Sequence, residues 1–515
     1  MSRPKGFLVG VEIRYLLLFV LSVVANAHLF TSFAMINDEG VTVYGAQRWL
    51  QGQWPYSHFE TRHTPGSYAL TAAFFAIFGD SQMATRLLML LLAGLQGLLV
   101  FHLSSGLKGS LRYAPWACWT AIGLLDFPVL GYHWMAILFY TALAAAARGW
   151  LLYPQQSWWP RLCGTLLALS GYFLQSEGLA AVLLVGLVWV CWRPAGILQV
   201  GLGAATTSAV LWLPFLPVWH RVLQDSVLDV HSYIRFNRHP YSFEDLYPLW
   251  QGAKASSWSG DAVGTGFAWT RLLVYTLKYG LYYPVLAAGL LLSWRRNDRD
   301  AQLIALATVA LTLANLNRQT LEYLAFLQPL WFIVLFRVAG AFAPVLLSLL
   351  VVYWGGYLGL WWRDCRFAIP TPAGTYYTEN PSQAAAYNKV GEWIRQHLQP
   401  GDRALCYPFQ PALYALWKLR SPLPQSFLVP LSTPPATLQQ AVDQARRQNN
   451  AWVIYLPMNP LDCNVPVLDY QQQERHWLLQ LTRDLQLLED FHGIQLYRRI
   501  PEAQGVNSNL RKASL

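Results

Sequence analysis

Long apolar runs separated by short polar turns fill the first 362 residues of the chain. An α-helix needs about 20 apolar residues to cross the hydrocarbon core of a membrane. The pattern predicts about eleven spans, at Phe7–Phe30, Ala84–Gly106, Tyr113–Tyr132, His133–Tyr153, Leu162–Gln175, Gly178–Trp192, Gly196–Trp219, Trp269–Trp294, Ala301–Asn315, Leu321–Ala339 and Phe342–Trp362. The fifth and sixth would each be only about 21 Å long as helices. We expect them to form a tilted or partly buried hairpin, hinged at Ser176-Glu177.

After residue 362 the pattern becomes that of a soluble domain, because helical and strand periodicities alternate in shorter segments. The expected helices and strands are Ala384–Leu398 (helix), Arg403–Tyr407 (strand), Ala436–Gln448 (helix), Ala451–Leu456 (strand), Tyr470–Leu487 (helix) and Ile494–Arg498 (strand). This order predicts a small α/β domain over residues 363–515. Its last dozen residues have the composition of a disordered tail.

Composition and charge support a polytopic α-helical membrane protein, because 54% of the residues are hydrophobic and 24 are Trp. The net charge of +10 comes mostly from short basic clusters between the apolar runs, such as Lys108/Arg112 and Arg295/Arg296/Arg299. Such clusters are typical of the inner ends of spans rather than of a nucleic-acid-binding stripe. The six Cys residues show neither metal-ligand spacing nor a disulfide framework.

Counting spans from an inner N-terminus gives the chain a consistent topology. The loop 31–83, the loop 220–267 and the domain 363–515 then fall on the outer side, and the basic clusters fall on the inner side. Ala25-Asn26-Ala27 near the end of the first apolar run could mark a cleaved signal peptide. The run is nevertheless long enough to span, and the loop 31–83 lies outside in either case.

The loop 31–83 carries two adjacent carboxylates, Asp38 and Glu39, directly after the first span in a chain of which only 12% is charged. Such carboxylates at a membrane surface are costly unless they are hydrated, paired or used. They could cap the helical segment Gly40–Leu50. They could also act as a general base on an acceptor hydroxyl, or hold a divalent cation.

Further polar residues predicted near the outer face complete a candidate site. Arg62 and His63 could neutralise a lipid-linked phosphate or be surface charge. Lys278 lies inside an apolar run, where a Lys is expensive unless it snorkels to the surface. It is a further candidate for binding the donor phosphate, as is Arg318. The other candidates are His58, Glu60, Asp126, Glu177, Arg318 and Glu322, of which the last two could simply form a helical ion pair.

The chain resembles the GT-C superfamily of polytopic glycosyltransferases. It is most similar to the branch with protein O-mannosyltransferases, lipid A aminoarabinose transferases and RgtA/B/C/D-like galacturonosyltransferases. The motifs that carry the resemblance are INDEG, PYSHFETRHTPGSYALTAAFFAIFG followed by Arg86, FLQSEGL, NRQTLEYLAFLQP and PGDRALCYPFQPALYALWKLRSP. The resemblance implies a GT-C fold with Asp38 as catalytic base, Glu39 beside it, and Arg62, His63 and Arg318 near the donor phosphate. The sequence departs from the family pattern at His58, Thr64 and Gln175.

These observations together predict an enzyme that moves a sugar from a polyprenyl-phosphate donor to a lipid, glycan or protein acceptor on the outer face. The membrane would be the bacterial plasma membrane, and no nucleic acid would be involved. Two alternatives stay open: a lipid or polysaccharide transporter or flippase, and a catalytically inactive GT-C-like scaffold. Inverted repeats, which are typical of many transporters, are not evident in the sequence.

Overall fold

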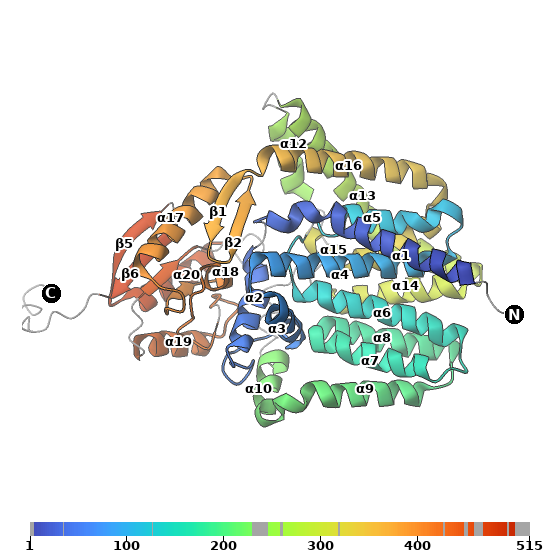
Figure 1. Ribbon diagram of the computed structural model, residues 1–515, viewed down its shortest axis with the longest axis horizontal. Coiled ribbons are helices and arrows are strands. Elements are labelled where there is room, and N and C mark those ends of the chain that lie inside the picture. The colour runs from blue at the N-terminus through green and yellow to red at the C-terminus, as the bar shows by residue number, and fades with distance from the viewer. Residues whose placement is uncertain are drawn as a thin grey trace, which may run out of the picture.

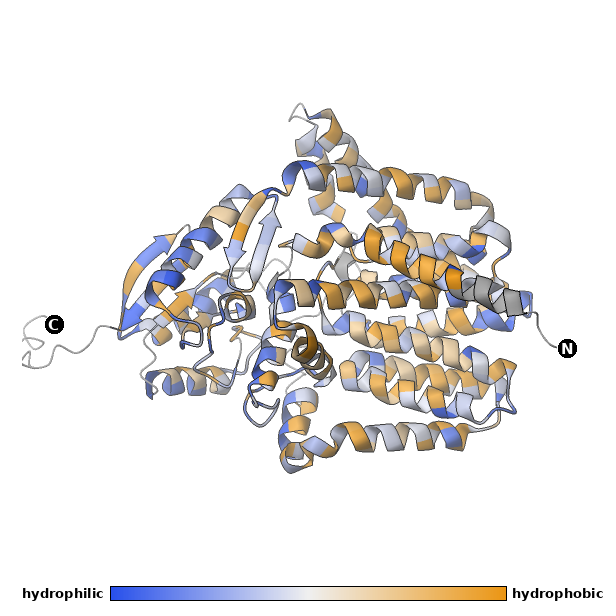
Figure 2. Cartoon of the chain, in the orientation of Figure 1, coloured by the Kyte–Doolittle hydropathy of each residue, from blue (hydrophilic) through white to orange (hydrophobic). Residues whose placement is uncertain are grey.

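The protein consists of a bundle of long helices with a smaller α/β domain packed against one end of it (Figure 1). Apolar residues dominate the bundle helices, whereas the α/β domain is more polar (Figure 2). The computed structural model describes residues 5–33, 36–125, 127–228, 246–257, 261–317, 320–425, 428–447, 452–457, 467–491 and 494–499.

Most helices of the bundle follow the predicted apolar runs, whereas three shorter ones, Gly66–Phe78, Trp219–Leu223 and Tyr247–Ser256, were not among the predicted spans. The bundle helices are α1 (Lys5–Ala25), α3 (Gly66–Phe78), α4 (Gln82–Leu103), α5 (Ala114–Ile122), α6 (Tyr132–Leu152), α7 (Trp158–Phe173), α8 (Gln175–Trp192), α9 (Ile197–Trp212), α10 (Trp219–Leu223), α12 (Tyr247–Ser256), α13 (Ala262–Arg295), α14 (Arg299–Ala314), α15 (Leu321–Val338) and α16 (Ala343–Asp364). Among the described residues, five helices are long and apolar enough to cross a membrane by themselves. A helical membrane protein is thus supported, and the number of about eleven spans stays a prediction.

The predicted span Tyr113–Tyr132 is wrong as one continuous helix. Helix α5 ends at Ile122, and the described residues of 123–131 are not helical. Gly123 and Pro128 explain the break, because glycine weakens a helix and proline cannot donate the helical hydrogen bond. The candidate Asp126 falls in this segment and lies outside the described residues.

The predicted hairpin of two short helices is present as α7 and α8, but its hinge lies at Leu174 rather than at Ser176-Glu177. Leu174 is extended, with φ −161° and ψ 137°. The backbones of the two helices meet closely, since a Cβ at Gly178 would lie 2.6 Å from the Cα of Gly171. Glu177 therefore lies in the first turn of α8, fully buried, instead of at an exposed tip.

The α/β domain contains a four-stranded sheet in the order β3-β4-β6-β5, in which β3 and β4 are parallel and the other pairs antiparallel. Its strands and helices are β1 (Phe367–Thr371), β2 (Gly374–Thr378), α17 (Pro381–His397), β3 (Leu405–Tyr407), α18 (Pro411–Trp417), α19 (Pro435–Arg447), β4 (Trp452–Tyr455), α20 (Val467–Thr482), β5 (Leu485–Phe491) and β6 (Ile494–Arg499). The predicted helix Tyr470–Leu487 runs too far, because α20 ends at Thr482 and its last predicted residues begin β5. The hairpin β1–β2 and helix α18 were not predicted.

The two parts meet across helix α2 (Ile36–Leu50), which follows the short helix η1 (Ala27–Thr31). Helix α2 packs against α3 on one side and α18 on the other, as Figure 1 shows. We call the end of the bundle at which α2 and the α/β domain meet the junction end. At the opposite end, the far end, α13 finishes in the basic cluster that begins at Arg295, so the α/β domain and this cluster lie at opposite ends of the helices.

Candidate active site

The site begins at the first turn of α2, which contains both Asp38 and Glu39. Two carboxylates are favourable there because the N-terminal end of a helix carries a partial positive charge. The two side chains have different surroundings. Asp38 is half-buried, whereas Glu39 is almost fully buried, with 1% of its surface exposed.

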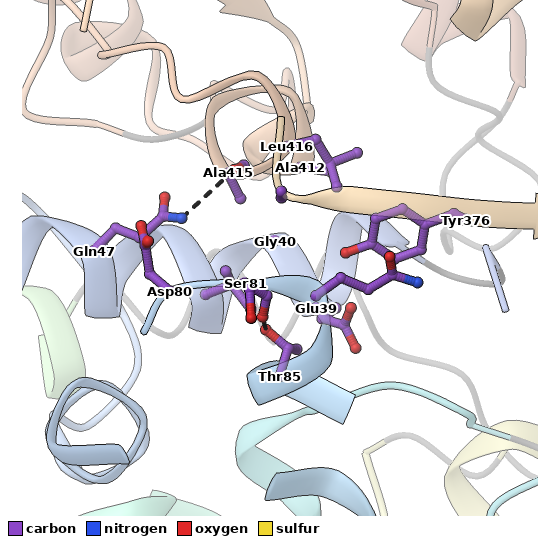
Figure 3. A pocket seen from close by; sticks show the side chains of 13 residues that line it. Glu39, Gly40, Gln47, Asp80, Ser81, Thr85, Tyr376, Ala412, Ala415 and Leu416 are labelled. Atoms are coloured by element: carbon purple, nitrogen blue, oxygen red, sulfur yellow. Dashed lines mark hydrogen bonds between the residues drawn. The ribbon is translucent and has the colours of Figure 1, made fainter. Parts of the chain in front are cut away.

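Glu39, which Figure 3 labels, forms an ion pair with the buried Arg86. Its Oε2 lies 2.9 Å from Nη1 of Arg86 and accepts a hydrogen bond of 2.9 Å from the backbone N–H of Leu130. Arg86 is itself fully buried and donates to the backbone oxygens of Pro128 and Ser32. Burial raises the pKa of Glu39, and Arg86 and the Leu130 N–H oppose that rise. Glu39 is thus an anchor that fixes α2 to two segments of the bundle.

His63 is buried in the loop between α2 and α3 and stacks on Tyr132, with the ring centroids 4.1 Å apart. Burial, followed by the nearby charges of His133 and Arg62, lowers the pKa of His63 to about 3. The imidazole is therefore neutral at neutral pH. This disfavours the expected role of His63 as a phosphate-neutralising cation and leaves it a neutral hydrogen-bonding group.

Arg62 lies where three parts of the chain meet. Its Nη1 donates to Oγ of Ser432 in the α/β domain at 2.8 Å. Its backbone oxygen accepts a hydrogen bond of 2.8 Å from Nε2 of Gln175, which also donates to the backbone oxygen of Ser226. The half-buried guanidinium of Arg62 is thus placed between the loop, the α7–α8 hairpin and the α/β domain.

A buried His–Glu pair lies beneath this loop. Nδ1 of His133 is 3.9 Å from Oε1 of Glu177, and the other carboxylate oxygen of Glu177 accepts a hydrogen bond from Ser176. The ring of His133 also stacks on Phe326 of α15 at 4.3 Å. Sequence reasoning selected Glu177 but missed His133. The signal available was a lone His at the start of an apolar helix.

The segment 130–133 joins these groups into one neighbourhood. Leu130 donates its backbone N–H to Glu39, and Tyr132 stacks on His63. His133 faces Glu177. The structure thus brings together the first turn of α2, the loop before α3 and the start of α8.

The remaining candidates are His58, Glu60, Arg318 and Glu322. His58 and Glu60 have exposed side chains. Arg318 and the side chain of Glu322 lie outside the described residues. No group of three or more His, Cys, Asp or Glu side chains within the described ranges could hold a metal ion.

Lys278 lines a separate, apolar cavity of about 560 Å³, counted with its open mouth. The cavity lies between α5, α13, α15 and α16, and none of the other candidate residues that the structure describes lines it. Lys278 is buried, and its Nζ lies 5.0 Å from the ring centroid of Tyr275. As the 17th residue of α13, it is about 24 Å along the helix axis from Ala262. It therefore does not snorkel to the surface.

Comparisons with solved structures identify the fold. ArnT from Cupriavidus metallidurans bound to undecaprenyl phosphate matches with a TM-score of 0.56 and 12% identity, over 98% of this chain and 100% of that chain. The apo state of the same enzyme also gives a TM-score of 0.56 and 12% identity, over 96% and 98% of the two chains. The Archaeoglobus fulgidus oligosaccharyltransferase gives 0.48 and 12% identity, over 85% and 67%. Neither family models nor curated proteins match the sequence. The likeness to ArnT shows that the chain has the same fold as that enzyme, as the resemblance implied.

Proposed function

We propose that the protein is a membrane glycosyltransferase that moves a sugar from a polyprenyl-phosphate donor to an acceptor hydroxyl on a lipid, glycan or protein. The observation that carries the proposal is the first turn of α2. It holds a half-buried Asp38 beside an anchored Glu39, at the junction end of a fold shared with ArnT. That relative has been seen with undecaprenyl phosphate, which supports a polyprenyl-linked donor here.

In this proposal Asp38 is the general base. Its carboxylate takes the proton from the acceptor hydroxyl while the acceptor oxygen attacks the anomeric carbon of the sugar. The bond from that carbon to the phosphate oxygen breaks, and the electron pair leaves with the phosphate. An in-line attack of this kind inverts the anomeric centre. Glu39 does not share the work of the base, because Arg86 and Leu130 already engage its carboxylate.

Arg62 is the proposed contact for the leaving phosphate. It is a half-buried cation within the same neighbourhood as the α2 turn, and a guanidinium is well suited to bind phosphate oxygens. His63 would contribute a neutral hydrogen bond, and Arg318 remains a proposed partner from the family resemblance. The apolar walls of the Lys278 cavity suit the isoprenoid tail of the carrier rather than its phosphate.

The bacterial plasma membrane, with the junction end and the α/β domain outside, is the proposed location. The basic cluster at the far end supports this orientation, because Lys and Arg are enriched on the inner side of membranes.

The experiment is a transfer assay with the purified protein in lipid nanodiscs, using labelled polyprenyl-phosphate sugars. Asp38→Asn should reduce transfer by about 10²–10⁴-fold without changing the thermal unfolding temperature. Glu392→Gln, an exposed carboxylate of α17, is the matched control and should keep wild-type activity. An Asp38→Asn protein with full activity would refute the assignment of the base. Substrate counterflow without any sugar transfer would favour a transporter, and inactivity with every donor would favour a scaffold.

A further inference from the structure

We propose that the α/β domain is a working part of the active site, and that its helix α18 positions Asp38 by pressing against Gly40 of α2. The inference rests on the proposed function, since it concerns the placement of the base. It gives Gly40 and the segment 411–425 a positioning role that the sequence did not suggest.

The contact at Gly40 is backbone to backbone. A Cβ placed on Gly40 would overlap the backbone nitrogen of Ala412 and lie 2.6 Å from its Cα. Gly40 is a helical residue with no need for positive φ, so its hydrogen side chain is explained by this close approach. Gly40 is separated from Asp38 by one residue, so that a shift of α2 at this contact moves the base as well.

The rest of α2 continues the same interface. Tyr44 stacks on Tyr414 of α18, with ring centroids 4.7 Å apart, and its hydroxyl accepts a hydrogen bond of 2.7 Å from the backbone N–H of Ser421. Arg48, which is buried, donates to the backbone oxygen of Pro424 at 2.9 Å. The α/β domain therefore contacts successive turns of one face of α2.

The first turn of α2 is consequently held from two sides. In Figure 3, Glu39 and Gly40 lie between Thr85 of the bundle helix α4 and the α/β domain residues Tyr376 and Ala412. All five residues line one pocket. Glu39 binds the bundle through Arg86. Arg86 in turn lies 5.9 Å from the ring centroid of Tyr376. The base is thus set by contacts from both domains.

A positioning role has a kinetic signature. A displacement of about 1 Å at a reacting group can cost about 10²-fold in rate, while donor affinity depends on groups elsewhere. We therefore expect changes at the α2–α18 interface to lower kcat with little change in the KM for the donor.

The first test compares Gly40→Ala with Gly201→Ala. Gly201 lies in α9, and a Cβ there would meet nothing within 4 Å, so the same chemical change is made without a clash. We expect Gly40→Ala to lower kcat at least 10-fold, with the KM for a polyprenyl-phosphate sugar within about twofold of wild type. Hydrogen exchange of the α2 amides should become faster in Gly40→Ala and stay as in wild type in Gly201→Ala.

A milder variant covers the case in which Gly40→Ala does not fold. Tyr44→Phe keeps the stack on Tyr414 but removes the hydrogen-bond acceptor of Ser421. It should lower kcat severalfold and accelerate exchange in α2 to a smaller extent. Lys418, at the end of α18, binds Asp80 in the loop between α3 and α4 at 2.6 Å. This second contact between the α/β domain and the bundle allows a charge-reversal test. Asp80→Lys and Lys418→Asp should each lower kcat, and the double variant should restore it.

The outcomes separate this inference from the proposed function. Faster exchange in α2 together with a fall in kcat supports it. Unchanged kcat in a folded Gly40→Ala protein overturns it, whether or not exchange changes. A fall in kcat that is matched by an equal loss in Gly201→Ala also overturns it. If the wild-type protein transfers no sugar, the proposed function fails, and unchanged α2 exchange in Gly40→Ala would then still overturn the positioning contact.

Discussion

The two ends of the helical bundle both contain arginine–carboxylate pairs, but in different surroundings. At the junction end, Glu39 and Arg86 are both essentially inaccessible to solvent, with 2% and 0% of their side chains exposed. At the far end, Arg148 binds Asp300 at 2.7 Å with 17% and 25% exposed. The same kind of ion pair is therefore dry at one end and partly hydrated at the other.

This difference separates two uses of charge. The far-end pair joins α6 to α14 near their ends. If this pair is broken, water can hydrate both side chains. The junction-end pair fixes the turn that presents Asp38, and neither partner can turn to solvent. A buried ion pair contributes little net stability but is costly to break on one side, which suits a residue whose task is position.

Removing Arg86 should have the largest effect on stability. Arg86→Met leaves Glu39 as an unpaired buried carboxylate, which should lower the free energy of unfolding by about 3–5 kcal/mol. Thermal and chemical unfolding of the purified protein would measure the loss. The double variant Glu39→Gln, Arg86→Met should recover most of the stability, since it removes the buried charge. A double variant no more stable than the single one would contradict this account of the junction end.

The neutral His63 should give an intermediate effect that depends on pH. In the folded protein the pKa of His63 is about 3, below the usual 6.5. The imidazole therefore binds a proton more readily in the unfolded chain. The stabilising effect is complete above pH 6.5 and is lost as the pH falls from 6.5 towards 3. Between pH 6.5 and 5 the loss should be about 2 kcal/mol.

The measurement for His63 is the unfolding free energy as a function of pH. His63→Gln should flatten the curve between pH 6.5 and 5. His58→Gln changes an exposed imidazole of the same loop and serves as the matched control, which should keep the wild-type slope. A wild-type slope in His63→Gln would show that this histidine is not held neutral by burial.

The smallest effect is expected at the far end. Arg148→Gln should cost about 1 kcal/mol or less, because a partly hydrated pair is screened and its partner Asp300 can be solvated. Raising the ionic strength should reduce the difference from wild type further. A loss as large as that of Arg86→Met would remove the distinction between the two ends.

Much of the fold was predictable because its main signal is local. Most long apolar runs became helices within a few residues of their predicted ends, as in Ala84–Gly106 against α4 (Gln82–Leu103). Two runs deviate by seven residues at one end, since α9 ends at Trp212 and α13 begins at Ala262. The run Tyr113–Tyr132 fails as one helix where Gly123 and Pro128 interrupt an otherwise apolar run. Hydropathy alone does not register such a break, because both residues are compatible with a membrane segment.

The candidate site was predictable only in part. Asp38 and Glu39 were selected from their type and position, but their different surroundings depend on Arg86, which reaches Glu39 from a different helix. The contact of Gly40 with Ala412 and the pair of His133 with Glu177 are likewise tertiary, and no sequence spacing encodes them. Lys278 shows the opposite case, since an expensive residue was recognised but its separate cavity was not.

The distance along the chain between α2 and α18 has a consequence for biosynthesis. Gln47 of α2 and Ala415 of α18 are in contact although 368 residues separate them. At about 5–20 residues per second, the ribosome synthesises α2 tens of seconds before it synthesises α18, the helix that packs against α2. A chain whose synthesis stops before residue 411 would lack helix α18, so that the first turn of α2, with Asp38, would be held from the bundle side alone.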